Sequence, residues 1–279
     1  GNRPGVLKPQ FDTIIPNSDG SGEITKIGKG VDKKRLGQKV WVWNGQWQRP
    51  HGTASQFIAL PSEQAILIPK TMSFETGACL GIPGLTAAQC TLGDGSLKGK
   101  TILISGGAGS VGNLSIQLAK WSGARVIATG SSTGFDRIKN AGADYVFGYS
   151  DPQLEQKILD ISPSGIDRVI EVEFGNNINL FPKIMKPYSV LSVYGSAKNM
   201  VPILPFGQYL YKGIKISIEL IYILPELPRL RAIKNLHDAH FDKALKTGID
   251  TIYDLSECAI AHDKSLTPGR AGAILLNTN

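Results

Sequence analysis

The sequence is poor in cysteine, with Cys79, Cys90 and Cys258 among 279 residues. An odd number at wide spacing argues against a disulfide framework and suits a reducing compartment, so we expect a cytoplasmic protein. The absence of a cysteine cluster excludes a structural zinc site of four thiolates. His51 stands alone in a loop, and Asp19 is expected to cap a glycine-rich turn. We therefore expect no metal.

Long apolar runs and dense charge are also missing. No run reaches the roughly 18 apolar residues that a membrane span needs, so we expect no membrane partner. The 30 basic and 23 acidic side chains give a net charge of +7, without a Lys/Arg-rich block. This balance suits a phosphorylated cofactor or a nucleic acid, and it is also common in enzymes. With 42% hydrophobic residues the chain can bury a core, and its length suits two domains.

From residue 99 to residue 220, short apolar runs alternate with helical patterns, which is typical of βα units on a parallel sheet. The runs are continuous rather than alternating, as in strands covered on both faces. One helix is predicted to open at Asp151-Pro152, and another to cover Leu227 to Lys246 and end at Gly248. The predicted strands are Thr101–Ser105, Arg125–Thr129, Tyr145–Phe147, Asp167–Val172, Ser189–Tyr194 and Lys215–Leu220.

A glycine-rich run, Gly107-Ala108-Gly109-Ser110-Val111-Gly112, separates the first predicted strand from a helical pattern that starts at Asn113. Glycines allow the backbone to approach a pyrophosphate, and a helix N-terminus offers unpaired N–H groups and a partial positive charge. The GxGxxG pattern alone is weak, but the flanking strand and helix are those that a dinucleotide site needs. We expect five residues to contact the cofactor here: Gly107, Gly109, Ser110, Val111 and Gly112.

Before residue 81 the sequence is β-like, with runs at 24–28, 39–43 and 55–60 separated by turn-forming residues. The tail from Arg270 to Leu276 predicts one more strand that rejoins this region. We therefore expect an α/β protein with a doubly wound parallel Rossmann sheet over residues 88–249. Residues 1–87, with 250–279 returning to them, are expected to form a discontinuous β domain.

The end of the second predicted strand bears on the choice of cofactor. An acidic residue about twenty positions past the glycines holds the ribose 2′-hydroxyl of NAD, but this region reads Thr129-Gly130-Ser131-Ser132-Thr133. Hydroxyl side chains can donate hydrogen bonds to a 2′-phosphate, which a carboxylate would repel. NADPH is therefore the predicted cofactor, bound by Ser131 and Ser132. Arg137 is the nearest cation and either pairs with the phosphate or is a solvated helix residue.

Without a metal, the chemistry that remains is direct hydride transfer to an acceptor that is already electrophilic, such as a quinone or a conjugated enone. Such a reaction needs positioning and exclusion of water rather than a strong acid. No nucleophile–base pair is evident in the sequence. His237 and His240 are three residues apart on a predicted helix, where a solvated face is the better interpretation.

Five segments resemble the zeta-crystallin-like quinone oxidoreductase branch of the zinc-free medium-chain dehydrogenase/reductase family, and together they cover essentially the whole chain. The resemblance implies a GroES-like, partly open β-barrel domain, a Rossmann domain and an active cleft between them. It also implies a homodimer that pairs through an edge strand. The five segments are residues 15–22, 81–87, 105–112, 140–144 and 268–276.

The resemblance assigns further site residues by position. Thr86 is similar to a threonine at the nicotinamide end of the cleft, Tyr149 to a tyrosine near the 2′-phosphate, and Arg270 to a basic residue near the adenosine phosphate. Trp43 and Tyr222 are candidates to line the acceptor pocket, although aromatic residues on β-like runs are more often core. Backbone contacts to the cofactor are expected from Gly195, Ser196 and Ile221.

The chain departs from the family pattern in three places. Asn17 replaces a usual glycine, which asparagine can imitate because it tolerates positive φ. Gly134 stands where many relatives carry a lysine, which leaves Ser131, Arg137 and Tyr149 to bind the 2′-phosphate. The Asn and Tyr expected in the substrate pocket would precede Gly1, so the catalytic residues are unknown and the β-barrel domain is expected to be N-terminally truncated.

The leading hypothesis is an NADPH-dependent oxidoreductase that reduces quinones. An NADPH-dependent reductase of enal or enone double bonds is the enzymatic alternative, and a non-catalytic binder of single-stranded nucleic acid is the alternative from another class. The basic charge motivates the latter, but the sequence shows no basic–aromatic stacking ladder. A truncated form that folds without turnover is the third alternative.

Overall fold

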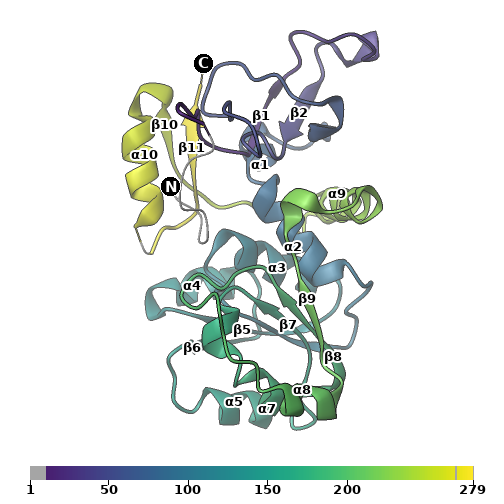
Figure 1. Ribbon diagram of the computed structural model, residues 1–279, viewed down its shortest axis with the longest axis vertical. Coiled ribbons are helices and arrows are strands. Elements are labelled where there is room, and N and C mark those ends of the chain that lie inside the picture. The colour runs from purple at the N-terminus through teal and green to yellow at the C-terminus, as the bar shows by residue number, and fades with distance from the viewer. Residues whose placement is uncertain (1–10, 268, 279) are drawn as a thin grey trace. The chain divides into compact units, whose positions relative to one another are not determined.

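The chain divides into two compact units in a computed structural model that describes residues 11–267 and 269–278 (Figure 1). We call Gly1–Leu85 with Lys246–Asn279 the split unit, and Thr86–Leu245 the sheet unit. The boundary between them falls inside helix α2 (Ile82–Leu92). The ends of the predicted ranges 1–87 and 250–279, and Pro268 of the last resembling segment, lie outside the described residues.

The sheet unit is built on a parallel sheet of six strands in the order β6-β5-β4-β7-β8-β9. Numbered within the unit, this order is 3-2-1-4-5-6, that of the Rossmann fold. Each of the six predicted strands is present, so the predicted fold is confirmed. Their bounds are β4 (Thr101–Ile104), β5 (Arg125–Gly130), β6 (Tyr145–Gly148), β7 (Ile166–Glu171), β8 (Met185–Val193) and β9 (Lys215–Ile218).

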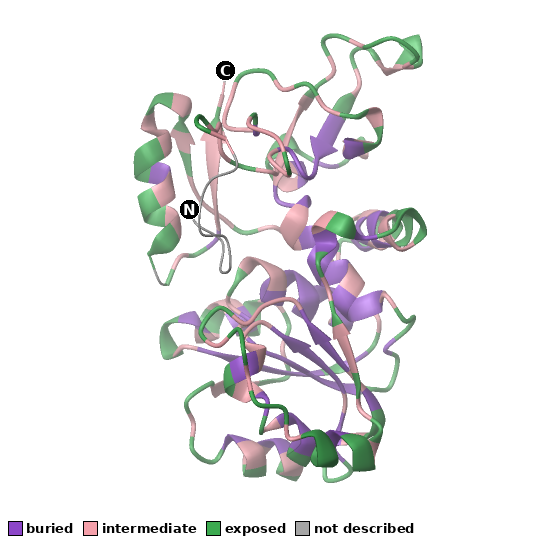
Figure 2. Cartoon of the chain, in the orientation of Figure 1, coloured by how far each residue is buried: buried purple, intermediate pink, exposed green. Residues whose placement is uncertain are grey.

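Both faces of this sheet are covered. All four residues of β4 are buried although their side chains alternate between the two faces, which explains its continuous apolar sequence. Figure 2 shows the central strands as buried. The helices of the unit, besides α2, are α3 (Ser110–Trp121), α4 (Phe135–Asn140), α5 (Leu154–Ile161), α6 (Phe174–Asn177), α7 (Phe181–Ile184), α8 (Phe206–Lys212) and α9 (Glu226–Phe241).

Two predicted helix bounds in the sheet unit are wrong. Helix α5 begins at Leu154 because the Asp151 carboxylate accepts the Gln153 N–H at 2.9 Å and closes a turn first, so Pro152 lies before the helix. Helix α9 ends at Phe241 rather than Lys246, because Lys243 adopts a positive φ of 57° that an α-helix cannot continue.

The split unit contains a small antiparallel sheet of β1 (Gly20–Glu23), β2 (Lys39–Val42) and β3 (Ala65–Leu67). It also contains α1 (Phe74–Ala78), α10 (Cys258–Leu266) and the parallel pair of β10 (Ile249–Asp254) and β11 (Ala273–Asn277). The predicted tail strand is therefore present, whereas its partner β10 was not predicted.

The strand predictions at 24–28 and 55–60 are wrong. Ile24 exchanges backbone hydrogen bonds with residues 37 and 38, but a turn closed from Val31 N–H to Gly28 O interrupts the pairing. In the second segment the Ser55 hydroxyl bonds the carbonyls of Gly52 and Phe57, and Phe57 is 75% exposed. Both segments have strand-like composition without a described partner strand.

Asp19 in the split unit caps a helix. Its Oδ1 accepts the N–H of Ile82, the first residue of α2, at 2.6 Å. A Cβ at Gly81 would lie 2.2 Å from this oxygen, so the glycine is required for the approach. The structure thus shows that Asp19 caps the start of α2, and its expected role in the glycine-rich turn stays a prediction.

Candidate functional site

The glycine-rich run forms a tight turn between β4 and the N-terminus of α3. Gly109 is the N-cap of this helix, and no side chain caps it. The first helical bond runs from the Asn113 N–H to the Gly109 carbonyl at 2.9 Å. The N–H groups of Ser110, Val111 and Gly112 therefore have no helical carbonyl to bond, and they form the end of the helix that favours an anion.

Close backbone approach explains why the run needs glycine. A Cβ at Gly112 would lie 2.3 Å from the Gly106 carbonyl oxygen, and one at Gly107 would lie 2.9 Å from the Ile116 side chain. Gly106 adopts a φ of 65°, which favours glycine. Sequence reasoning missed Gly106, although its place directly before the GxGxxG pattern was a usable signal.

The residues predicted to bind a 2′-phosphate gather where β5 and β6 end. Ser131 follows β5, and its hydroxyl lies 3.0 Å from the hydroxyl of Thr133. The backbone N–H of Tyr149, which follows β6 and is 59% exposed, donates to the Gly130 carbonyl at 3.2 Å. Ser132 begins the next short turn and Arg137 lies on α4, whose first-turn acid is Asp136.

Gly134 leaves no room for a larger residue. A Cβ at this position would lie 2.6 Å from the Cβ of Ala108 in the glycine-rich turn. A lysine at this position, which many relatives are expected to carry, would therefore clash with the glycine-rich turn. Gly134 is buried, and it brings the segment after β5 directly against the turn.

Further predicted residues lie past the ends of β8 and β9. The Gly195 carbonyl accepts the Phe174 N–H at 3.1 Å, and the Ser196 hydroxyl accepts the Gly175 N–H at 2.8 Å. Ile221 is buried, and Tyr222 next to it is partly exposed. The sheet unit thus places the predicted glycine, serine, arginine and tyrosine contacts at one edge, where its strands end, as the rule for open α/β sheets requires.

Three predicted residues do not follow the strand ends of the sheet. Thr86 lies on α2 and is buried. Trp43 in the split unit is 4% exposed, and its indole N–H donates to the Glu63 carbonyl at 3.3 Å, an environment typical of a core residue. Arg270, also in the split unit, is near Asp250, whose pKa is lowered mainly by the Ala271 N–H and further by the Arg270 charge.

A buried acid at the same edge was missed. Glu171, the last residue of β7, is fully buried and its carboxylate accepts three hydrogen bonds, one of them from Ser105 beside the glycine-rich turn. A charged residue inside an apolar strand pattern was the signal that could have found it. Burial raises the pKa of this carboxyl, whereas the hydrogen bonds that it accepts lower it.

The described part of the chain contains no group of three or more His, Cys, Asp or Glu side chains that could hold a metal ion. In the same residues, no helix combines the length and apolar character that crossing a bilayer requires.

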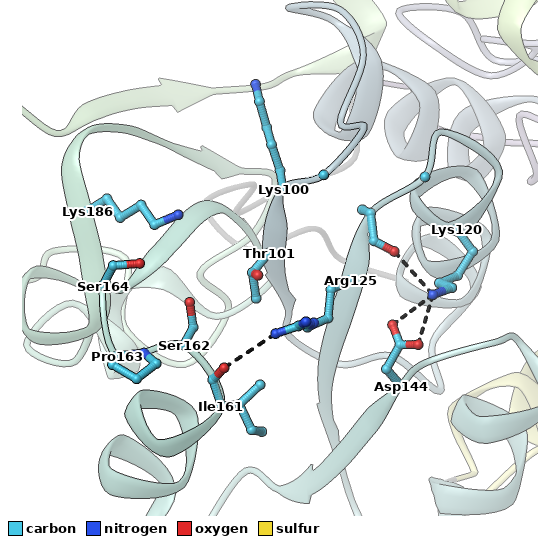
Figure 3. A pocket seen from close by; sticks show the side chains of 13 residues that line it. Lys100, Thr101, Lys120, Arg125, Asp144, Ile161, Ser162, Pro163, Ser164 and Lys186 are labelled. Atoms are coloured by element: carbon cyan, nitrogen blue, oxygen red, sulfur yellow. Dashed lines mark hydrogen bonds and ion pairs between the residues drawn. The ribbon is translucent and has the colours of Figure 1, made fainter.

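A polar cavity of about 580 Å³ lies at the opposite edge, where the strands begin (Figure 3). Its cations are largely engaged: Lys120 pairs with Asp144 at 2.8 Å, and Lys186 pairs with Asp167 at 2.8 Å. The Arg125 guanidinium points to the Ile161 carbonyl at 3.5 Å. This cavity is therefore separate from the predicted cofactor contacts.

The strand order, the uncapped helix N-terminus and the glycine-rich turn together define a Rossmann fold. Residues 110–229 match the family model "Zinc-binding dehydrogenase". The spinach chloroplastic quinone-oxidoreductase homolog is 28% identical over 285 residues, covering 98% of this chain and 83% of that protein. The human synaptic vesicle membrane protein VAT-1 homolog is 29% identical over 188 residues, covering 66% of this chain and 46% of that protein.

Solved structures agree on the fold. A quinone oxidoreductase from Pseudomonas syringae has a TM-score of 0.83 at 22% identity, covering 98% of this chain and 84% of that one. A mycobacterial protein complexed with NADPH has a TM-score of 0.81 at 21% identity, covering 93% of this chain and 81% of that one. The chain is thus similar over nearly its whole length to quinone-oxidoreductase homologues, and the solved structures share its fold. This confirms the family resemblance and the Rossmann and GroES-like fold class.

Proposed function

We propose that the chain is an NADPH-dependent oxidoreductase that reduces quinones by direct hydride transfer without a metal. The observation that carries this proposal is the uncapped N-terminus of α3 beside the Gly106–Gly109 turn, at the edge where the parallel strands end. The sheet unit would be the dinucleotide-binding domain and the split unit the substrate domain. The names of the quinone-oxidoreductase relatives support the same class of acceptor.

The residues present fit a dinucleotide. The N–H groups of Ser110, Val111 and Gly112 would bind the pyrophosphate, because a helix N-terminus carries about half a positive charge. Glycine at 107 and 112 lets the turn pack closely against the start of α3, because an added Cβ would meet the Ile116 side chain or the Gly106 carbonyl. The backbone at Gly195, Ser196 and Ile221 would bind the remaining parts of the cofactor.

The preference for NADPH over NADH rests on the end of β5. Residues 129–133 contain no carboxylate, and Ser131 and Ser132 offer hydroxyl donors. Arg137 and Tyr149 follow the ends of β5 and β6 and would complete the contacts to a 2′-phosphate. Thr86 and Arg270 stay predictions for the nicotinamide and adenosine ends.

When bound, the cofactor supplies a hydride to the electrophilic acceptor. The chain's part is to orient the nicotinamide and to exclude water, and solvent can supply the proton because the reduced quinone delocalises its charge. Of the two aromatic residues predicted to line the acceptor pocket, we propose that the partly exposed Tyr222 contacts the acceptor, because Trp43 is buried.

The test is a titration of the chain with NADPH and with NADH, followed by cofactor fluorescence. We expect tighter binding of NADPH, and equal affinities would contradict the role of the β5 end. A panel of quinones, enals and enones then identifies the acceptor. Turnover of enones alone would replace the quinone proposal by double-bond reduction, and cofactor binding without any turnover would identify a non-catalytic form.

The alternative of nucleic-acid binding is tested with single-stranded RNA and DNA in saturating NADPH. Retention that persists and falls steeply with salt would favour it. No retention at low salt would remove it.

We also propose that two copies pair through β9. This strand has a neighbour on one side among the described strands, β8, and Ile218 on it is 78% exposed. The segment that precedes β9 in the chain carries further exposed apolar side chains, among them Val201, Ile203 and Tyr211, each at 88–91%. A second copy would cover this edge. Light scattering should give a dimer mass that Ile218→Lys converts to a monomer mass. A monomeric wild type would refute the pairing.

We propose the cytoplasm as the location of the protein, from its low and odd number of cysteines.

A further inference from the structure

The buried Glu171 carboxylate has no counter-ion among the described residues, because none of their ion pairs includes it. It is 0% exposed, yet it ends the central strand β7 at the edge that carries the predicted cofactor contacts. A buried carboxylate is costly unless it is fully hydrogen-bonded. The hydrogen bonds that the carboxylate accepts must therefore offset the cost of its burial.

Three donors from two segments converge on this carboxylate. The Ser105 hydroxyl donates to Oε2 at 2.5 Å. The backbone N–H of Glu173 donates to Oε1 at 2.5 Å, and the side-chain amide of Asn177 donates to the same oxygen at 3.0 Å. All three partners are donors toward the carboxylate, so its ionised, acceptor-only form satisfies each of them.

One of these donors fixes the start of the glycine-rich turn. Ser105 directly precedes Gly106, whose φ of 65° begins the turn, and its own N–H donates to the Ile170 carbonyl of β7 at 2.9 Å. The Gly106 carbonyl in turn accepts the Gly109 N–H at 2.9 Å. The position of Ser105 therefore sets where the uncapped end of α3 lies.

The other two donors fix the turn after β8. Residues 173–177 hold this turn through two bonds, from the Phe174 N–H to the Gly195 carbonyl and from the Gly175 N–H to the Ser196 hydroxyl. A Cβ at Gly175 would lie 2.1 Å from the Asn199 carbonyl, so these segments are in close contact. Glu171 thus connects two separate segments that are both predicted to contact the cofactor.

We propose that Glu171 is a positioning residue: its carboxylate sets the spacing between the glycine-rich turn and the Gly195–Ser196 turn that together receive the dinucleotide. This role rests on the proposed cofactor binding. Glu171 itself would not touch the cofactor. It would act through Ser105 on one side and through residues 173–177 on the other.

The test compares Glu171→Ala, Glu171→Gln and a matched control, Asp167→Ala, in the full chain. Asp167 lies on the same strand and bonds the Thr101 N–H at the other end of β4 at 2.8 Å. We expect Glu171→Ala to weaken NADPH binding at least tenfold and Asp167→Ala to leave it within twofold. Glu171→Gln should stay within twofold of wild type, because glutamine keeps an acceptor oxygen and can donate to the Ser105 hydroxyl.

Amide hydrogen exchange without cofactor gives a second readout. Glu171→Ala should exchange faster than wild type at both 105–109 and 193–199. Ser105→Ala should speed amide exchange at residues 105–109 alone, and Asn177→Ala should speed it at 193–199 alone. These two variants test the positioning role if Glu171→Ala does not fold.

The outcomes separate the two proposals. A wild type that binds neither NADPH nor NADH overturns the proposed function and the positioning role with it. A wild type that binds, combined with unchanged affinity and exchange in the Glu171 and Ser105 variants, overturns the positioning role alone. Equal losses of affinity in Glu171→Ala and Asp167→Ala also overturn it, because they indicate general destabilisation.

Discussion

Gly112→Ala is the substitution whose effect the glycine-rich turn determines most directly. The added Cβ would lie 2.3 Å from the Gly106 carbonyl oxygen and 2.9 Å from the Gly107 Cα, and both are backbone atoms. Forcing an extra carbon into a packed site costs about 1–3 kcal/mol, and alanine returns about 1 kcal/mol of helix propensity. We expect a net loss of up to about 2 kcal/mol in unfolding free energy.

The same displacement moves the N–H groups that would receive the pyrophosphate. We therefore expect NADPH affinity to fall by roughly tenfold, which corresponds to about 1.4 kcal/mol. Urea unfolding and cofactor titration measure the two effects separately.

Gly207→Ala is the matched control for this experiment. Gly207 is also helical, on α8, and the nearest atom to its added Cβ is the Tyr211 ring at 4.0 Å. This variant should gain up to about 1 kcal/mol from helix propensity and bind cofactor as wild type does. A Gly112→Ala protein that matches it in both stability and affinity would refute the close approach in the turn.

Three further outcomes are expected. Arg137→Ala should raise the Kd for NADPH by roughly tenfold and the Kd for NADH much less. Lys139→Ala on the same helix is the control and should change neither Kd. Equal losses of affinity for both cofactors in Arg137→Ala would exclude a phosphate contact. Ser131→Asp should reverse the preference toward NADH in the same titration, since a carboxylate repels the 2′-phosphate, and unchanged preference would speak against this site. Burial raises the pKa of the Glu171 carboxyl above its ordinary 4.5, so folding favours the protonated carboxyl. The contribution of this carboxyl to stability is therefore present below pH 4.5 and is lost as the pH rises through the pKa of the folded state. Glu171→Gln should therefore gain stability relative to wild type as the pH rises from 4.5 to 8, and a constant difference in urea unfolding would contradict this.

The sheet unit was predictable because each parallel strand carries its own signal. Strands such as Thr101–Ile104 are apolar at every position, since helices cover both faces, and this pattern needs no knowledge of the partner strand. The glycine-rich turn was predictable for the same local reason. Its closest approach, between Gly112 and Gly106, depends on residues six positions apart.

The split unit was harder to predict because its short strands depend on distant partners. Residues 24–28 look like a strand, but the ladder that would support them stops after Ile24. The strand Ile249–Asp254 was missed because its partner, Ala273–Asn277, lies more than twenty residues away. Glu171 was missed for a similar reason: its three donors come from other strands and loops, which a reading along the chain does not bring together.

The contact between Gly134 and Ala108 makes two distant positions dependent on each other. Any side chain at residue 134 meets the Ala108 methyl group at 2.6 Å, so a basic residue introduced there needs glycine at 108 as well. Homologous sequences should then vary these two sites in concert. A library that randomises position 134 alone, in order to strengthen binding of the 2′-phosphate, should yield few folded variants. A library that varies positions 108 and 134 together should yield more.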